Sequence, residues 1–132
     1  MSEQLEIQTP SHSCFVDITA DVQRAVVRSG LREGVCIVFA PHTTAGVTIN
    51  ENADPTVRSD VLTALGRMVP WDAGYEHDEG NAAAHMKASL MGSSQSVIVE
   101  NGKLKLGPWQ AIYLAEFDGP RSRRVFVRTL SG

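Results

Sequence analysis

The sequence has few of the features that mark secreted or membrane-spanning proteins. Its only cysteines, Cys14 and Cys36, each lie within an apolar run, SCFVDI or VCIVFA. Such positions are typical of buried, reduced thiols, so we expect a cytoplasmic protein without a disulfide. The N-terminus, MSEQLEIQTP, lacks the basic and apolar regions of a secretory signal. No apolar stretch approaches the ~20 residues that a membrane-spanning helix needs, and we therefore expect no membrane partner.

An excess of positive charge is also missing. The chain has 12 lysines and arginines against 15 aspartates and glutamates, for a formal net charge of -3. A chain of this charge has no global field that would attract nucleic acid, so we expect no nucleic-acid partner, and any anion site must be local. Its 132 residues, 42% of them hydrophobic, predict a single domain over residues 1–132.

Hydrophobic periodicity predicts about seven strands and three helices, an α+β fold with a mainly antiparallel sheet. We expect one helix capped by Thr19 and ending at Gly30, one that begins at Asp54-Pro55, and one capped by Asn81 and ending at Gly92. The Asn101-Gly102 pair predicts a tight type I′ hairpin. The runs 35–40 and 47–52 are predicted to pair as a hairpin joined by PHTTAG.

Three of the four histidines are candidates for chemistry. His42 follows the run 35–40, His77 lies in the acidic loop 71–80, and His85 is one turn into the third helix. Their spacing matches no local zinc signature, although a fold can assemble imidazole ligands from separate elements. His85 stands on a face of small residues, so a bulky group could approach it. The alternative is a structural His85 that donates one hydrogen bond to a carbonyl.

Acidic and amide groups gather near the end of the segment 41–55. Glu51 shares the strand phase of Val47 and Ile49, so it should point toward the covered side of the sheet and need a partner. A paired carboxylate there is a candidate general base. Asp54, directly before Pro55, is predicted to cap a helix. We expect the polar groups at both ends of this segment to form one pocket wall.

Four arginines form the basic cluster of this acidic chain: Arg121, Arg123, Arg124 and Arg128. Guanidinium groups bind phosphate in a bidentate manner, which favours a phosphorylated ligand. A solvated strand edge that discourages aggregation is the alternative. The helix start at Gly80-Asn81 offers free backbone N–H groups of the kind that attract anions.

Three segments in order identify a family resemblance: HTTAGVTINENADP, YEHDEGNAAAHMKASLMGSS and VENGKLKLGPWQAIYLAEFDGPRSRR. From about residue 12 to the C-terminus, the chain resembles the YjbQ-like family, small proteins associated with a secondary thiamine-phosphate synthase activity. The resemblance implies a seven-stranded, two-sheet β-sandwich with helices, assembled as a homotrimer with its sites near subunit contacts. One departure is Pro108, where the family usually has threonine, so a contact from that hydroxyl is absent.

The resemblance also implies an activity and a set of site residues. The expected enzyme condenses a pyrimidine pyrophosphate with a thiazole phosphate at a histidine-lined pocket for phosphate and a divalent metal, zinc or magnesium. A non-catalytic metal- or phosphate-binding trimer and a phosphate-ester hydrolase are the alternatives. His42, His77, His85 and Glu51 are the expected catalytic residues, and the same three histidines are the expected metal ligands. The expected ligand-binding residues are Thr43, Thr44, Asn52, Asp54, Asn81, Arg121 and Arg124.

Overall fold

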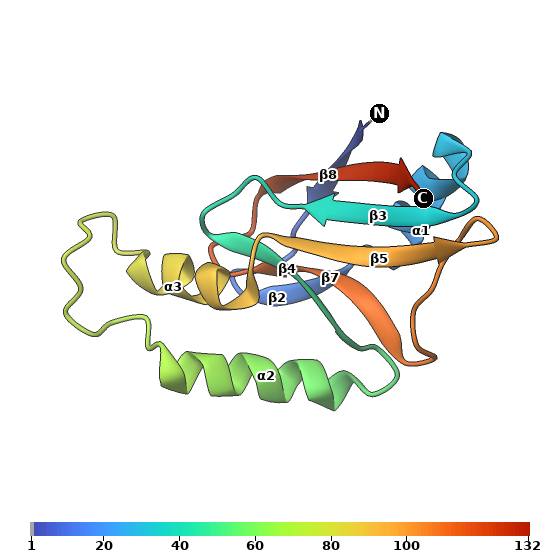
Figure 1. Cartoon of the computed structure of the whole chain (residues 1–132). Helices are drawn as coiled ribbons and strands as arrows, with labels where there is room; N and C mark the ends of the chain where they lie inside the picture. The colour runs from blue at the N-terminus through green and yellow to red at the C-terminus, as the bar shows by residue number, and fades with distance from the viewer. Residues whose placement is uncertain (1) are drawn as a thin grey trace.

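The computed structural model describes residues 2–132 and contains three helices and two antiparallel sheets (Figure 1). The strands are β1 (Ser2–Gln8), β2 (Cys14–Asp17), β3 (Gly34–Phe39), β4 (Ala45–Glu51), β5 (Ser94–Glu100), β6 (Lys103–Leu104), β7 (Gln110–Glu116) and β8 (Ser122–Ser131). The helices are α1 (Thr19–Ser29), α2 (Pro55–Met68) and α3 (Ala82–Met91). The predicted α+β fold with two sheets is confirmed.

The two sheets pack face to face. One has the strand order β1-β8-β3-β5-β6 and the other β2-β7-β4. Their facing sides bury a core of short aliphatic side chains, as the strand alternation predicts. This core includes Val38, Val47, Val99, Leu114 and Val125. The structure is thus a sandwich of two sheets around one core.

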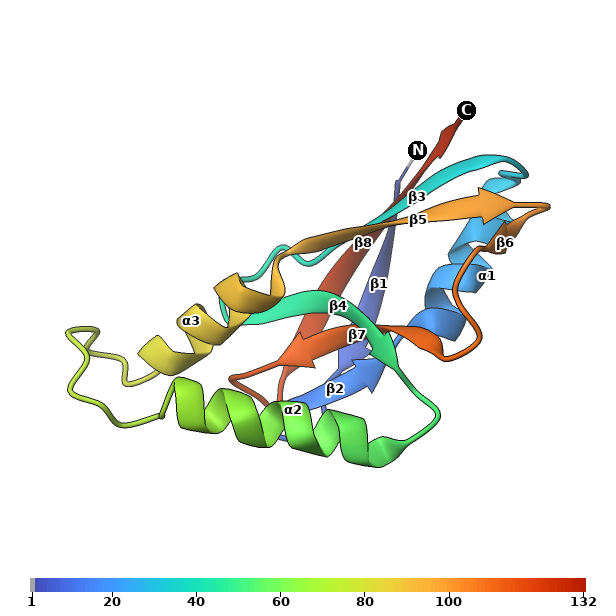
Figure 2. The same ribbon diagram turned by 60° about the horizontal axis from the view of Figure 1, so that its bottom comes forward.

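Two helices cover the other face of the three-stranded sheet (Figures 1 and 2). A second apolar cluster joins them to that sheet, with Leu65 from α2, Ala84 and Ala88 from α3, and Ala115 from β7. Helix α1 instead contributes Val22, Ala25 and Val26 to the core between the sheets. None of the helices within residues 2–132 is long and apolar enough to cross a membrane.

The helix ends follow local chemistry closely. Asp54 Oδ1 accepts a hydrogen bond from the Thr56 N–H at 2.9 Å, so the predicted cap of α2 is confirmed. Gly30 ends α1 in the left-handed conformation, with φ 76°. Thr19 is not the cap of α1 but its first residue. Its hydroxyl donates a hydrogen bond to Asp17 Oδ1 at 2.6 Å. Asn81 occupies the N-cap position of α3 without a capping side-chain bond.

The predicted hairpin of residues 35–40 and 47–52 is wrong. Strand β3 pairs with β5 on one side and β8 on the other, which leaves it no free edge for β4. Strand β4 pairs with β7 in the other sheet. The segment PHTTAG therefore crosses from one sheet to the other. The Asn101-Gly102 hairpin is confirmed, since the two residues have φ angles of 53° and 75°.

Candidate functional site

His42 and His85 line one groove at the end of the sandwich where α3 packs on β4. The groove has a volume of about 490 Å³. Its other lining residues are small or carry hydroxyl groups: Thr43, Ala45, Ala88, Ser89, Gly92 and Ser93. The small side chains of α3 leave the imidazole of His85 accessible. Two imidazoles and three hydroxyl groups therefore face the same space.

His77, in the loop before α3, contacts the imidazole of His85. The ring centroids of His77 and His85 lie 5.2 Å apart, with the ring planes at 85°. His77 Nε2 is 3.9 Å from Glu79 Oε2, on an exposed part of the loop. In the part of the chain that the structure describes, the ring of His85 makes no hydrogen bond, so the expected alternative of a bond to a carbonyl is not seen. Its ring nitrogens are free for a ligand.

The backbone of β8 holds His42 in one orientation. The Arg124 N–H donates to His42 Nε2 at 2.9 Å. The Arg124 carbonyl oxygen is 3.1 Å from the same nitrogen. Because a backbone N–H can only donate, Nε2 is the acceptor and the hydrogen of the neutral ring resides on Nδ1. His42 therefore has an N–H group at Nδ1 that is not used by Arg124.

The surroundings of His42 favour this neutral form. Burial lowers the pKa of His42, and the positive charges of Arg123 and Arg124 lower it further. The contact with the Arg124 backbone and the charge of Glu116 act in the opposite direction without reversing the shift. His42 is thus an uncharged imidazole near neutral pH.

A buried ion pair between the two sheets supports the loop that carries His42. Arg123 and Glu116 are 3% and 0% exposed. Arg123 Nε donates to Glu116 Oε1 at 2.8 Å, and its Nη2 donates to Glu116 Oε2. The same Nη2 donates to Thr44 Oγ1 at 2.9 Å, while the Thr9 hydroxyl donates to Glu116 Oε1 at 2.8 Å. Arg123 therefore holds the side chain of Thr44, two residues after His42, in place.

The ion pair stays charged despite its burial. Burial alone would raise the pKa of Glu116, but hydrogen bonds from Arg123, Thr9 and the Asp118 N–H outweigh it, so the net pKa lies below its ordinary value. Sequence reasoning missed Glu116 altogether. The signal was a lone carboxylate within the apolar run AIYLAEF, since a charge in such a run needs a buried partner.

The polar residues after β4 lie far from the histidine groove. Glu51 is the last residue of β4, and Ala45, the first residue of β4, lines the groove. The six residue steps between them span ~20 Å along the strand. The expected single pocket wall is therefore wrong. The Glu51 carboxylate makes no ion pair within residues 2–132. The backbone N–H of Asn52, the next residue, donates to the Trp109 carbonyl oxygen at 2.9 Å. The segment with Pro108 lies at this same end, since β7 pairs Gln110 with Glu51.

The carboxylate of Asp54 serves the helix rather than a ligand. The hydroxyl and the backbone N–H of Thr56 lower the pKa of Asp54 by hydrogen bonding to it. These bonds stabilise the charged form of a helix cap. A catalytic role for this carboxylate has no geometric support, and the ligand-binding role of Asp54 and Asn52 stays a prediction.

Asn81 and Arg121 meet at one carboxylate. Asn81 Nδ2 donates to Asp118 Oδ2 at 2.9 Å, and Arg121 Nη2 lies 3.2 Å from the same oxygen. Arg121 is thus neutralised by Asp118. The predicted basic cluster is divided, because Arg123 points between the sheets whereas Arg124 and Arg128 are exposed. Arg124 contacts the groove residue His42 through its backbone N–H.

The structure does not assemble the expected metal site. Across residues 2–132, no group of three or more histidine, cysteine, aspartate or glutamate side chains is placed to hold a metal ion. His77 and His85 are neighbours and His42 shares the groove, but the three do not form a ligand set. The presence of a divalent metal stays a prediction.

Comparison with known proteins places this two-sheet architecture in a family. Residues 3–132 match the family described as UPF0047 protein YjbQ-like, so the chain belongs to the YjbQ-like UPF0047 family. It is 47% identical over 131 residues to the UPF0047 protein YugU of Bacillus subtilis, covering 98% of this chain and 99% of that one. A UPF0047 protein of Methanocaldococcus jannaschii is 45% identical over 125 residues, covering 95% and 91%.

Solved structures agree with the fold. A YjbQ/UPF0047 family protein of Clostridium acetobutylicum superposes with a TM-score of 0.95 at 55% identity, covering 97% of this chain and 99% of that one. A YjbQ-like protein of Sulfolobus solfataricus gives a TM-score of 0.95 at 32% identity, covering 100% and 97%. The resemblance found in the sequence is confirmed.

The predicted activity is wrong. The family and these relatives support membership of UPF0047 but give no thiamine-phosphate synthase activity, and the histidine-lined metal pocket on which that activity depended does not form in the described residues. The alternatives, a metal- or phosphate-binding trimer without turnover and a phosphate-ester hydrolase, gain no support either.

Proposed function

We propose that the groove between His42 and His85 binds a small polar molecule and acts on it by proton transfer. The observation that carries this proposal is the orientation of His42, whose Nε2 accepts from the Arg124 N–H at 2.9 Å and whose Nδ1–H remains available. A neutral imidazole at a groove wall can donate a hydrogen bond from Nδ1 to a ligand and so orient it for proton transfer to a second group.

His85 supplies the complementary group. Its ring makes no hydrogen bond in the described chain, and its contact with His77 is an edge-on ring contact at 5.2 Å. It can therefore accept a proton from a ligand to which the Nδ1–H of His42 donates a hydrogen bond. The hydroxyl groups of Thr43, Ser89 and Ser93 offer further hydrogen bonds to a polar ligand. Among residues 2–132, no carboxylate lines the groove, so an uncharged or anionic ligand fits it better than a cation.

A thermal-shift screen tests this proposal. Sugars, sugar phosphates and short hydroxy acids are added to the wild type, to His42→Gln, to His85→Gln and to His12→Gln as a control outside the groove. Zn²⁺ and Mg²⁺ are included, because a metal and a phosphorylated ligand stay predictions. We expect at least one polar compound to raise Tm in the wild type and the control, with the increase lost in the two groove variants. Equal increases in all four proteins would refute the proposal.

We also propose that the chain assembles as a homotrimer through the outer face of the five-stranded sheet. Within residues 2–132, no helix covers this face (Figures 1 and 2). Apolar side chains follow its three central strands, and paired positions bring them together: Phe39 with Phe126, and Val35 with Leu130 and Ile98. Ile98 is 56% exposed and Leu130 49%. A second copy that covers this stripe would remove it from water.

Light scattering coupled to gel filtration tests this assembly. The wild type should have the mass of three chains, and the double variant Phe39→Ser, Ile98→Ser should elute as a single chain with an unchanged circular dichroism spectrum. Val27→Ser is the matched control, since Val27 is 66% exposed on α1, away from this sheet face. A monomeric wild type, or a trimeric double variant, would contradict the proposal. A cytoplasmic location also stays a prediction.

A further inference from the structure

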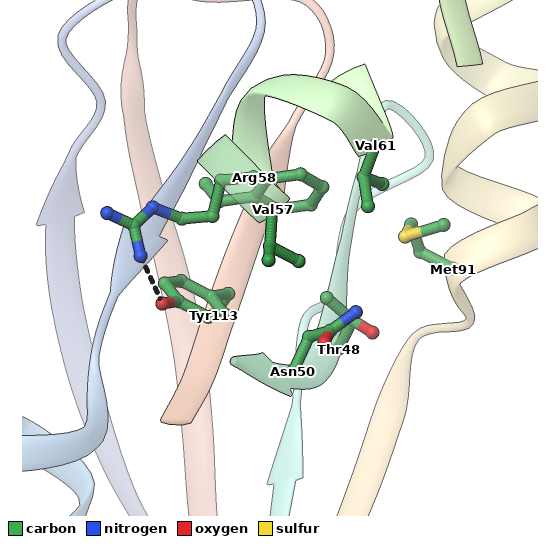
Figure 3. A pocket seen from close by; sticks show the side chains of 8 residues that line it. Thr48, Asn50, Val57, Arg58, Val61, Met91 and Tyr113 are labelled. Carbon is green, nitrogen blue, oxygen red and sulfur yellow. Dashed lines mark hydrogen bonds between the residues drawn. The ribbon is translucent and has the colours of Figure 1, made fainter. Parts of the chain in front are cut away.

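A second cavity lies between α2 and the three-stranded sheet, at some distance from the histidine groove. It has a volume of about 60 Å³ and shares none of the groove's lining residues. Apolar side chains form part of its wall: Phe15, Val57, Val61 and Met91. Polar side chains form the rest: Thr48, Asn50, Arg58 and Tyr113. Figure 3 shows most of these side chains and the contact between Arg58 and Tyr113.

The strand alternation of β4 explains why this space is not filled. Val47 and Ile49 face the core between the sheets, so Thr48 and Asn50 face the helices. From the other side, α2 offers the short side chains of Val57 and Val61 (Figure 3). Small groups on both surfaces leave a gap several times larger than the ~10–15 Å³ that a single water molecule requires.

The polar groups of the cavity have unused donors. Arg58 Nη1 donates to Tyr113 Oη at 2.8 Å, and this is the only hydrogen bond of its guanidinium group in the described chain. Asn50 Oδ1 accepts from the Glu51 N–H at 2.7 Å, which leaves its NH₂ group without a protein acceptor. The Thr48 hydroxyl has no partner within residues 2–132. A guanidinium, an amide and a hydroxyl thus offer donors at one cavity.

The charges around the cavity favour an anion. No acidic side chain of the described residues lines it. Asp54, the N-cap of α2, accepts from Thr56 and is not part of the wall, and the charge of Arg58 makes a smaller contribution to lowering its pKa. A planar guanidinium group binds a carboxylate in a bidentate manner, as it also binds phosphate. The apolar residues opposite suit a short hydrocarbon tail, which a phosphate ion lacks.

We propose that this cavity is a binding site for a short-chain aliphatic monocarboxylate. Its carboxylate bonds to Arg58 and to the amide of Asn50, and its tail packs against Val61 and Met91. The site is independent of the function proposed for the histidine groove, since the two have no lining residue in common.

Calorimetric titration with sodium acetate, propionate and butyrate, at chloride-matched ionic strength, tests the site. Propionamide, which has the shape of propionate without its charge, is the matched ligand control. We expect the carboxylates to bind and the amide to bind at least about ten-fold more weakly, because hydrogen bonds to charged groups are the stronger ones. Absence of carboxylate binding, or equal binding of the amide, would overturn the proposal.

Variants then locate the binding. Arg58→Gln should weaken propionate binding about ten-fold or more, whereas Arg67→Gln, on the last turn of the same helix, should leave it unchanged. Val61→Phe should block the cavity, which keeps the test valid if Arg58→Gln folds poorly. His42→Gln should bind propionate like the wild type. Binding that survives Arg58→Gln and Val61→Phe, or that is lost in His42→Gln, would refute this location.

The methyl group of Met91 provides a direct reading of position. With [methyl-¹³C]methionine labelling, propionate should shift the Met91 signal and leave that of Met68 in place, because Met91 lines the cavity and Met68 is 68% exposed at the end of α2. A shift of Met68 alone, or of neither signal at a saturating concentration, would contradict the proposed site.

Discussion

The Arg124 N–H donates to His42 Nε2 at 2.9 Å, where the pairing of β3 with β8 has ended. Register pairs Phe39, the last residue of β3, with Phe126, so no strand residue of β3 lies opposite Arg124, two residues before Phe126, to accept this N–H. The imidazole of His42 is the acceptor in place of a strand residue. One hydrogen bond therefore satisfies the Arg124 N–H beyond the end of β3 and sets the ring tautomer at the groove.

This relationship predicts the titration of His42. Burial and the two neighbouring arginines lower the pKa of His42, and protonation of Nε2 would bring two N–H groups face to face. We expect ¹⁵N-edited NMR to show a midpoint below the ordinary 6.5 and the hydrogen on Nδ1 at neutral pH. A midpoint above 6.5, or a hydrogen on Nε2, would show that the Arg124 bond does not control the ring.

The same shift predicts how stability depends on pH. The pKa of His42 is lower in the folded than in the unfolded protein. As the pH falls below about 6.5, His42 is therefore protonated first in the unfolded state. The free energy of unfolding decreases until the pH reaches the pKa of His42 in the folded state. Urea unfolding between about pH 7.5 and 5.5 should therefore show a smaller loss for His42→Gln than for the wild type. The pKa of Glu116, lowered from 4.5, acts in a more acidic range and does not interfere.

The ion pair of Glu116 and Arg123 predicts an asymmetry between single and double variants. Replacing Glu116 by Gln leaves Arg123 buried without a countercharge, which should cost about 3–5 kcal/mol in the free energy of unfolding. The double variant Glu116→Leu, Arg123→Met removes both charges and should cost less than the single one. Urea unfolding of the wild type and the two variants tests this prediction, and a double variant that costs as much as Glu116→Gln or more would contradict it.

The two cysteines should differ in reactivity. Burial raises the pKa of the Cys36 thiol to about 11, and its side chain is inaccessible between the sheets. Cys14 is half-buried, with Sγ 3.9 Å from the Ser11 carbonyl oxygen. A thiol reagent at neutral pH should modify Cys14 first and Cys36 only on unfolding. Cys14→Ser should abolish the reaction of the folded protein, and a remaining fast reaction would contradict the burial of Cys36.

Local features of the fold could be predicted from the sequence because their causes are local. Asp54-Pro55 specifies the start of α2, and Asn101-Gly102 specifies a turn that needs two positive φ angles. Hydrophobic periodicity likewise places most strands. These signals concern a few neighbouring residues, so a single sequence contains them.

The sheet partners and the internal support of the site depend on residues far apart in the chain. Strands β3 and β4 follow each other in sequence, yet β8, from the end of the chain, takes the edge of β3 that a hairpin would have used. Arg123 looked like one of several surface arginines, although it shares the strand phase of the buried Val125 and Val127. Only the packing of the two sheets reveals that Glu116 is its partner.

Gly46 lets α3 approach β4 closely enough to place His85 at the groove. A Cβ atom at this position would lie 2.5 Å from the Gly92 carbonyl oxygen and 3.0 Å from Met91 Cβ. That carbonyl also accepts a hydrogen bond from the Val47 N–H at 3.0 Å, so the end of α3 cannot retreat without losing this bond. Gly46→Ala should therefore lower the free energy of unfolding by about 1–3 kcal/mol through overpacking.

Gly66→Ala is the matched control for this prediction. Gly66 lies within α2, and a Cβ atom there meets nothing within 4 Å. Because alanine favours helix over glycine, this variant should gain about 0.5–1 kcal/mol. If α3 must approach β4 closely, the two substitutions change the free energy of unfolding, measured with urea, in opposite directions. The NMR signals of the His85 ring should then shift in Gly46→Ala but not in Gly66→Ala. Equal effects of the two substitutions would show instead that the contact of α3 with β4 yields without cost, and that Gly46 does not position the groove.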